Sequence, residues 1–502
     1  MKSNINKTVK STWVCMFFAC CQLMAVGSDS CNDDDAFRDG QTVCFLGDSI
    51  TKGGAYHGNI RLFYATRFPD RHIRFINCGV GGDRAESIVK NAKFRIESDV
   101  LAWKPTTVNV MLGMNDVGRK LYGDKMQAIE KDPKRWQGFA ADYLGRLGLP
   151  AVPPTLTEAR DACIELSSEK MTAIITRLKS SGARVILMTP SIYDETAVIA
   201  KGNGEVLKGV NGALGRCAAK VRQFSTDNQT GLVDAYGLMN EINRQEQAKN
   251  PTFSLVGAGK NWNDRVHPGP VGHFVMAYAF LKSQGLSPYV SRIELDAATG
   301  LAAGLVRCTV TDLKHDDSGI GFNCKEEALP FVPSPNAKES LRLVPFTDEL
   351  NQQLLLVRGL AKGSYELRID GDVIGLYSEA ELLNGVNLAT VTNTPQYRQS
   401  AKATEIATQI HEIGGELREI ATFKYGMSSR GGDPTDPEAV KKAVMELVEK
   451  AEANGQRLPP YLKSQRDCAL EPGKLEARIN ALEEELRVAC QPKVHHYAIS
   501  AK

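Results

Sequence analysis

The chain has 502 residues, a length that suggests about two to four domains, and 42% of its residues are hydrophobic and 24% charged. This composition is ordinary for a folded globular protein. The formal net charge of +2 argues against nucleic acid or an acidic membrane surface as a partner, because such partners need a concentrated basic field.

Residues 1–27 show the order of features that is typical of a secretory signal peptide. A basic start precedes an apolar stretch that ends in small residues: Lys2, Lys7 and Lys10, then Trp13 to Val26, with Ala25 to Gly27 at the cleavage site. The apolar stretch is too short for a permanent anchor, and no later segment is long and apolar enough to span a bilayer. We therefore expect export to the periplasm or the outside of the cell; a lipid anchor on Cys20 or Cys21 is the weaker alternative.

Residues 40–288 form the first expected domain, in which strand-like and helical segments alternate. Short apolar runs rich in β-branched residues recur along it: 42–46, 73–77, 107–112, 184–189 and 231–234. Because most of these runs lack polar alternation, they indicate strands covered on both faces. Helical spacing between them, as in 157–180, predicts an α/β domain with a mostly parallel sheet and helices on both sides. The polar stretch 120–154 is expected to be an insertion near the site rather than a core element.

Residues 291–385 lose the helical periodicity and are expected to form a small β domain. Its strand-like pieces are 305–310, 341–344, 354–357 and 364–369, with a hairpin turn at 370–372. Residues 390–502 are charged and helical again. Apolar residues at helical spacing in 438–453 and 474–489, separated by Pro459 and Pro460, predict a helical hairpin.

Twelve cysteines occur, three of them within the expected signal peptide. Because an exported protein permits disulfides, two pairs deserve a test: Cys308 with Cys324, and Cys468 with Cys490. Cys44 and Cys78 lie in apolar strand-like segments and are expected to be buried thiols. No Cys-x-x-Cys pair occurs and no other ligand cluster has metal spacing, so neither a metal nor another cofactor is expected.

Four short blocks carry the chemistry of the chain, and each lies at the carboxyl end of an expected strand or after the last strand. They are Gly47 to Ile50, Asn77 to Asp83, Gly113 to Asp116 and Asp264 to Pro268. Taken alone, each block has an ordinary explanation as a turn or a helix cap. The carboxyl ends of the strands of an open parallel sheet converge on one crevice, however, so four such blocks indicate one site.

The residue types in these blocks suit nucleophilic catalysis. Ser49 begins a helix, whose dipole favours developing negative charge. The amide of Asn115 can donate a hydrogen bond into the same crevice. The three-residue spacing of Asp264 and His267 lets the carboxylate hold the imidazole while its other nitrogen faces the hydroxyl.

The blocks resemble those of the SGNH hydrolases, also called GDSL-like lipases and esterases. The resemblance covers residues 42–286 and implies a three-layer α/β/α, flavodoxin-like domain. It also implies a catalytic set and an oxyanion hole: Ser49 as nucleophile with Asp264 and His267, and the backbone of Ser49 with Gly82 and Asn115. Gly79 and Gly81 are the alternatives to Gly82.

Five further residues near the blocks are weaker candidates for substrate contacts, each with a structural alternative. Asp48 adjoins the nucleophile. Arg84 and Arg119 follow the second and third blocks and can touch an anionic or sugar substrate, or simply be solvated. Tyr56 and Trp262 can form a stacking wall for a sugar ring, or pack in the core.

The substrate that we expect is an O-acetyl or similar ester on a carbohydrate, cleaved through an acyl-enzyme, because export and an open crevice suit such a polymer and no long apolar run suggests a lipase lid. Two alternatives remain open. One is a lysophospholipase or thioesterase on the same site. The other is a non-catalytic polysaccharide-binding protein, which would have no need for the catalytic set.

Overall fold

The computed structural model describes residue 33 and residues 35–198, 206–257, 264–316 and 319–502. The expected signal peptide and Trp262 lie outside the described residues. In the part of the chain that is described, no helix has both the length and the apolar character needed to cross a membrane.

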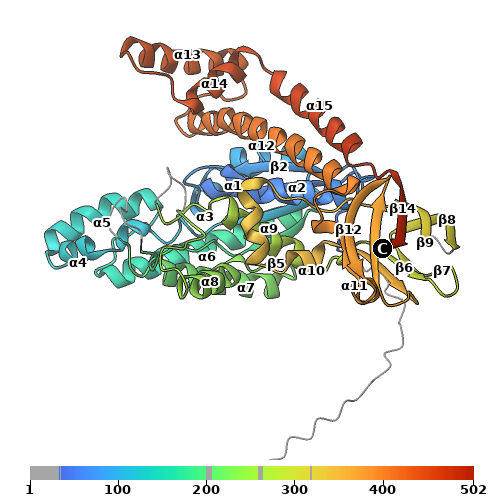
Figure 1. Cartoon of the computed structure of the whole chain (residues 1–502). Helices are drawn as coiled ribbons and strands as arrows, with labels where there is room; N and C mark the ends of the chain where they lie inside the picture. The colour runs from blue at the N-terminus through green and yellow to red at the C-terminus, as the bar shows by residue number, and fades with distance from the viewer. Residues whose placement is uncertain (1–32, 34, 199–205, 258–263, 317–318) are drawn as a thin grey trace, which may run out of the picture.

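A five-stranded parallel sheet forms the centre of the first half of the chain (Figure 1). The strands lie in the order β2-β1-β3-β4-β5, which is the flavodoxin-like order. Their bounds are β1 Thr42–Gly47, β2 Arg74–Gly79, β3 Thr107–Met111, β4 Arg184–Met188 and β5 Gly231–Val233. All five lie within or next to the expected runs, and the three-layer α/β/α prediction is confirmed.

Both faces of this sheet are buried, as the uninterrupted apolar runs predict. Along β1, Val43 and Phe45 belong to one core cluster whereas Cys44 and Leu46 belong to the other, because successive strand residues point to opposite faces. The main helices and turns of this half are α1 Ser49–Gly53, α2 Ala55–Arg67, α3 Ala85–Lys90, a π-helix Lys93–Ser98, α6 Leu156–Ser180, α7 Val210–Asn228, α8 Ala235–Gln247 and α9 Pro270–Lys282.

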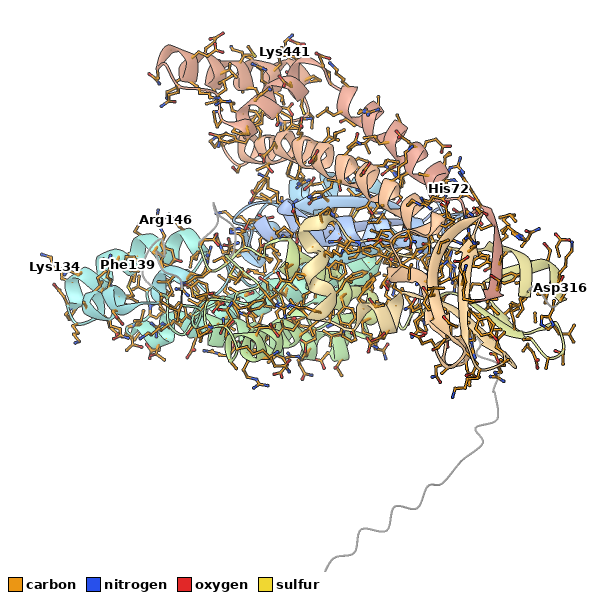
Figure 2. The ribbon with its side chains drawn as sticks, viewed as in Figure 1. His72, Lys134, Phe139, Arg146, Asp316 and Lys441 are labelled. Atoms are coloured by element: carbon orange, nitrogen blue, oxygen red, sulfur yellow. The ribbon has the colours of Figure 1, made fainter. Side chains whose placement is uncertain are left out.

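The insertion at 120–154 is helical and projects from the body of the molecule (Figure 1). It contains α4 (Asp124–Glu130) and α5 (Pro133–Leu147). Asp132 caps α5 by accepting hydrogen bonds from two backbone N–H groups, and Pro133 occupies its first position. Figure 2 shows Lys134, Phe139 and Arg146 on this arm.

Two further sheets pack face to face and enclose the third core cluster of the molecule. The four-stranded sheet has the order β13-β10-β6-β7 and the five-stranded sheet the order β12-β11-β14-β9-β8. Their strands are β6 Tyr289–Asp296, β7 Leu301–Val306, β8 Cys308–Asp316, β9 Gly319–Glu326, β10 Gln352–Arg358, β11 Ser364–Ile369, β12 Asp372–Ser378, β13 Val386–Asn387 and β14 Val494–Ala501. The expected hairpin is formed by β11 and β12, with positive φ angles at Asp370 and Gly371.

Three expectations for this region differ from the structure. Residues 341–344 are not a strand; they overlap a 3-10 helix, Pro335–Arg342, whose apolar side chains pack on the core of the first half. The run 305–310 is divided between two strands, because Arg307 has a left-handed φ of 52°. The range 390–502 ends in a strand rather than a helix: β14 pairs with both β9 and β11, and its His495 is buried.

The C-terminal helices are α12 Pro395–Ser428, α13 Pro437–Ala453, α14 Pro460–Leu470 and α15 Lys474–Ala489. Of these helices, α12 lies along the outside of the first half of the chain, and α13 and α14 lie on the far side of α12 (Figure 1). Apolar residues of α12 and α15 belong to the same core cluster as α2 and α9: Ala403, Ile406, Ala407, Ile410, Leu482 and Leu486. The two halves of the chain therefore share one hydrophobic core.

All eight cysteines in the described ranges are free thiols. The two expected disulfides are thus not formed. Cys468 lies on α14, where its thiol donates to a backbone carbonyl, whereas Cys490 is buried in the main core at the end of α15. Cys44 and Cys78 are buried thiols, as expected.

Candidate active site

Ser49 lies at the turn between β1 and α1, at the carboxyl edge of the central sheet. Asp48 caps the helix by accepting a hydrogen bond of 2.9 Å from the Ile50 N–H. The turn requires glycine at position 47, because a Cβ there would lie 2.3 Å from Thr51 Oγ1 and 2.7 Å from the Met111 carbonyl oxygen. Local packing thus explains the Gly-Asp-Ser triplet.

The structure brings Ser49, His267 and Asp264 together. The Nε2 atom of His267 lies 2.8 Å from Ser49 Oγ, and its Nδ1 is hydrogen-bonded to Asp264 Oδ2. The other carboxylate oxygen, Oδ1, accepts backbone N–H bonds of 3.0 Å from Val266 and His267. Two residues that are 218 positions apart in the sequence thus meet at hydrogen-bonding distance.

The carboxylate of Asp264 is strongly favoured over its acid form. Partial burial by itself would raise the pKa of Asp264, but the side-chain and backbone hydrogen bonds from His267 lower it to about 2. Asp264 is therefore ionised throughout the neutral range. A carboxylate on Nδ1 favours the imidazole tautomer whose Nε2 is free to accept the Ser49 proton.

The loop that carries Asp264 and His267 is anchored through Arg265. Its backbone has a left-handed φ of 59°, and its guanidinium donates to the carbonyl oxygens of Asp194 and Ala197 at 2.9 and 3.2 Å. The Asp194 N–H in turn donates to the Arg265 carbonyl at 3.0 Å. Sequence reasoning missed Asp194 and Ala197, since nothing in the 190–198 segment marks it as a partner of this loop.

The glycine loop, residues 79–83, follows β2 and lies beside the nucleophile. A Cβ on Gly81 would be 3.9 Å from the Ser49 Cβ. The Gly79 N–H donates to Asn77 Oδ1 at 2.9 Å, so this N–H is not directed at a substrate. Gly82 is exposed and has a left-handed φ of 82°, a conformation that glycine adopts without strain.

Asn115 lies between the first and second blocks. Its amide nitrogen donates to the Asp83 carbonyl at 3.1 Å and lies 3.5 Å from Asp48 Oδ2. Its amide oxygen accepts a bond of 3.1 Å from Arg119. The guanidinium of Arg119 therefore orients the Asn115 amide.

Asp116 is a further residue that sequence reasoning left without a role. Its buried carboxylate accepts the Gly113 N–H at 2.9 Å and the Ala85 N–H at 2.8 Å. Because Gly113 begins the third block and Ala85 begins the helix after the second, Asp116 joins these two blocks. Its position directly after Asn115 in the third block is the sequence feature that could have identified it.

The weaker substrate candidates have structural contacts. Tyr56 is fully buried; its hydroxyl bonds to Thr51 Oγ1 at 3.1 Å and its ring stacks on His273. Tyr56 therefore packs in the core, which was the alternative to a stacking wall for a sugar ring. Arg84 donates to the Arg146 carbonyl at 3.0 Å, which links the start of α3 to the end of α5.

Asp48 is 2% exposed and has the opposite pKa shift to Asp264. Burial and the negative charges of Asp116 and Asp83 together raise the pKa of Asp48 to about 7, against the opposing effect of the hydrogen bond from Ile50. Asp48 is thus a helix cap beneath the nucleophile rather than a surface group. In the described residues, no group of three or more His, Cys, Asp or Glu side chains has the arrangement needed to hold a metal ion.

A hydroxyl, an imidazole and a carboxylate connected in this order can activate the hydroxyl for attack on an acyl carbon. The glycine loop lies beside this hydroxyl, and the Asn115 amide is bonded to the loop through the Asp83 carbonyl. The arrangement suits acyl transfer to water.

Comparisons with known proteins agree with this chemistry. The model of the GDSL-like lipase/acylhydrolase family matches residues 43–280. An acetylxylan esterase from Geobacillus stearothermophilus is 24% identical over 268 residues, which are 50% of this chain and 98% of that protein. A solved structure, a gut microbial diltiazem-metabolizing enzyme, is 30% identical, with a TM-score of 0.75, and the alignment covers 93% of this chain and 98% of that one.

Proposed function

The chain belongs to the GDSL-like lipase/acylhydrolase family, and from that premise we propose that it removes O-acetyl or similar short acyl groups from carbohydrate. It is an ester-hydrolysing serine hydrolase. The observation that carries the proposal is the 2.8 Å contact between Ser49 Oγ and His267 Nε2, with Asp264 on the other imidazole nitrogen.

In the first step Ser49 Oγ attacks the acyl carbon while His267 Nε2 takes the hydroxyl proton. Asp264 stabilises the imidazolium that forms. His267 then gives this proton to the leaving alcohol oxygen as the bond between the acyl carbon and that oxygen breaks. In the second step water attacks the acyl carbon of the acyl-enzyme while His267 accepts a proton from the water. The bond between the acyl carbon and Ser49 Oγ then breaks, His267 returns the proton to Ser49 Oγ, and the carboxylic acid leaves.

The negative charge on the acyl oxygen is stabilised by the backbone N–H groups of Ser49 and Gly82 and by the Asn115 amide. Loss of one such donor typically lowers kcat by on the order of 10²–10³-fold. Arg119 supports this role, because it holds the amide oxygen of Asn115 and leaves the amide nitrogen directed between the first two blocks.

The carbohydrate substrate is supported by the acetylxylan esterase, 98% of whose length aligns with 50% of this chain. The diltiazem-metabolizing relative makes diltiazem a second compound to assay. A measured chain-length preference distinguishes this substrate from that of a lysophospholipase or thioesterase.

The first test measures hydrolysis of p-nitrophenyl acetate by the wild type, Ser49→Ala and His267→Ala, with Ser180→Ala, an exposed serine on α6, as the matched control. We expect the first two variants to lose activity by about 10³-fold or more with nearly unchanged thermal melts, and the control to keep it. Equal rates in the wild type and Ser49→Ala would remove the catalytic proposal.

The second test compares acetate with octanoate and decanoate esters, and then measures acetate release from acetylated xylan and other acetylated polysaccharides. Preference for acetate together with polysaccharide deacetylation supports the proposed substrate. Preference for the long acyl chains favours the lipid-directed alternative.

The proposal includes export, on the strength of the features of residues 1–27. Mass spectrometry of the protein recovered from the periplasm or medium checks it, with an expected N-terminus just after Gly27. Recovery of the full-length chain in the cytoplasm would contradict it.

A further inference from the structure

Arg418, on the C-terminal helix α12, reaches the backbone of the glycine loop. Its side chain is 5% exposed in the fold and donates from Nε to the Gly79 carbonyl at 2.6 Å. Its two terminal nitrogens form a bidentate pair with the Asp99 carboxylate at 2.7 and 2.5 Å. A planar guanidinium can serve both partners at once because its donors form a fixed fork.

Gly79 is packed directly on the helix that begins with the nucleophile. A Cβ at this glycine would lie 2.2 Å from the Lys52 nitrogen and 2.6 Å from the Thr51 carbonyl carbon. The Gly79 carbonyl, which Arg418 holds, therefore belongs to the part of the glycine loop that packs on α1. Movement of this segment would move both sides of the site.

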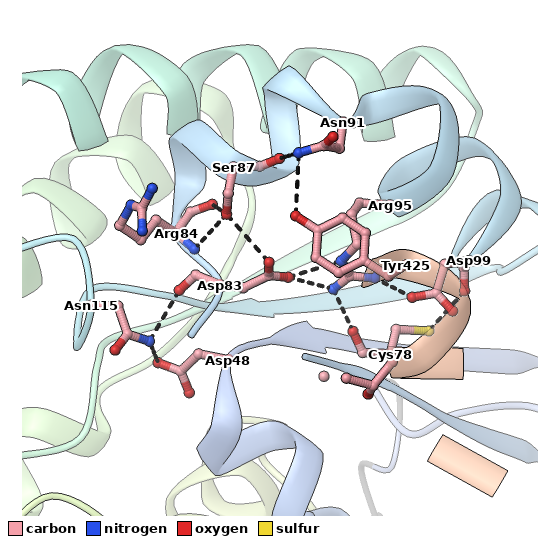
Figure 3. A network of polar contacts seen from close by, with 12 residues as sticks. Asp48, Cys78, Asp83, Arg84, Ser87, Asn91, Arg95, Asp99, Asn115 and Tyr425 are labelled. Carbon is pink, nitrogen blue, oxygen red and sulfur yellow. Dashed lines mark hydrogen bonds and ion pairs between the residues drawn. The ribbon is translucent and has the colours of Figure 1, made fainter. Parts of the chain in front are cut away.

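Asp99 connects Arg418 to the oxyanion side through a buried chain of polar contacts (Figure 3). Arg95 also binds Asp99, and it donates to Asp83 Oδ2 at 2.8 Å and to the Cys78 carbonyl at 2.8 Å. The Asp83 carbonyl accepts the amide of Asn115. Arg95 and Asp83 are at most 2% exposed, so these bonds are shielded from water and from salt.

Three other contacts hold α12 in the same place. Glu419, next to Arg418, forms an ion pair of 2.8 Å with Lys52 of α1. The ring of Tyr425 stacks on Phe94, with its centroid 5.8 Å away, and lies against the Arg95 guanidinium (Figure 3). The helix thus meets the nucleophile helix and the polar chain at consecutive turns.

We propose that Arg418 is a positioning residue for ester hydrolysis: by holding the Gly79 carbonyl and Asp99, it keeps the glycine loop and the Asn115 amide in register with Ser49. The inference rests on the proposed function. Arg418 lies outside residues 43–280, which the family model matches. A part of the chain beyond the family segment therefore belongs to the catalytic apparatus.

The experiment measures kcat and KM for p-nitrophenyl acetate in the full-length chain with Arg418→Met and Arg418→Lys. Arg398→Met is the matched control, because Arg398 is on the same helix and pairs with Asp372 at 2.7 Å, away from the site. The initial burst of p-nitrophenol counts the folded active sites, so that kcat is expressed per site. Wild type and Ser49→Ala are measured beside them, which separates failure of this inference from failure of the proposed function.

We expect Arg418→Met to lower kcat per site by about 10–100-fold with less than about a threefold change in KM, because the oxyanion donors are displaced rather than removed. Arg418→Lys is expected to fall between it and the wild type, since an ammonium can keep the pair with Asp99 but lacks the fork that also reaches Gly79. Arg398→Met is expected to keep kcat within about twofold.

A double-mutant cycle with Asn115→Ala decides whether Arg418 acts through the oxyanion side. In that background we expect Arg418→Met to lower kcat by a clearly smaller factor than in the wild type, because the Asn115 amide, one of the two groups that it positions, is already absent. If Arg418→Met does not fold, Asp99→Asn, which keeps the shape of the side chain and weakens the pair, takes its place in the cycle. Fully additive effects, or a kcat per site equal to that of Arg398→Met, would overturn the inference.

Discussion

Two aspartates near the nucleophile, Asp48 and Asp264, have opposite pKa shifts although they belong to the same site. Asp264 is half-exposed and surrounded by donors from His267, which lower its pKa to about 2. Asp48 is enclosed beneath α1 near two other carboxylates, and burial raises its pKa to about 7. Asp264 is therefore a carboxylate across the neutral pH range, whereas Asp48 stays protonated up to about pH 7.

The pKa of Asp48 predicts how stability changes with pH. The pKa of Asp48 is about 7 in the folded state, above its ordinary value of 3.8. Between pH 3.8 and pH 7, the folded state therefore keeps the Asp48 proton whereas the unfolded state has released it. Stability is therefore lost as the pH rises from 4 to 7, and the loss is complete above pH 7.

Asp48→Asn abolishes this loss while keeping an oxygen that can accept the Ile50 N–H. We expect its melting temperature to match that of the wild type near pH 4 and to exceed it by about 2–5 °C at pH 8. Thermal melts across this range check the prediction, with the exposed Asp70→Asn as control. A difference between Asp48→Asn and the wild type that does not change with pH would contradict it.

At the level of elements, the site depends on the close approach of two backbones, β2 at Gly79 and α1 at Lys52. A side chain at Gly79 would meet backbone atoms rather than the flexible end of a side chain, so the elements must separate to admit it. Gly53 on α1 has open space around its Cβ position and no positive φ.

Gly79→Ala is therefore expected to lower the free energy of unfolding by about 1–3 kcal/mol and to lower kcat at least tenfold, because α1 carries Ser49. Gly53→Ala is the matched control, and we expect it to be neutral or to stabilise by about 0.5–1 kcal/mol. Denaturant unfolding and the esterase assay measure both. The idea fails if the two variants are equally stable.

The sequence was sufficient to predict the strands of the central sheet and the four blocks at their ends, because both signals are local: apolar runs and turn residues. It could not predict Arg418 or Asp194, whose partners are hundreds or tens of residues away and whose local patterns are those of an ordinary helix and loop. The segment 341–344 was misread because a short apolar run does not distinguish a strand from a buried helical turn.

At the level of the whole molecule, the two halves of the chain are joined by a shared core rather than by a linker. Ile406 and Ile410 of α12 and Phe331 and Phe346 from the segment before it belong to the cluster formed by α2 and α9. The family model matches residues 43–280 alone, so the face of that segment that carries these contacts is covered in this chain by elements beyond it.

A fragment of residues 33–290 is thus expected to expose this apolar face and to lack a cooperative melt, in contrast to the full chain. Circular dichroism melts and size-exclusion chromatography of the two proteins check the prediction. A monomeric fragment with a sharp transition would show that the C-terminal half is dispensable for folding.

The position of β14 has a consequence for biosynthesis. This strand is synthesised only after helices α12 to α15, yet it lies between β9 and β11, which emerge much earlier. Until it arrives, two partial sheets wait with open edges, which can recruit other chains. The nascent protein therefore remains exposed to aggregation through these edges until β14 is made, and insertion of this single strand closes both edges at once.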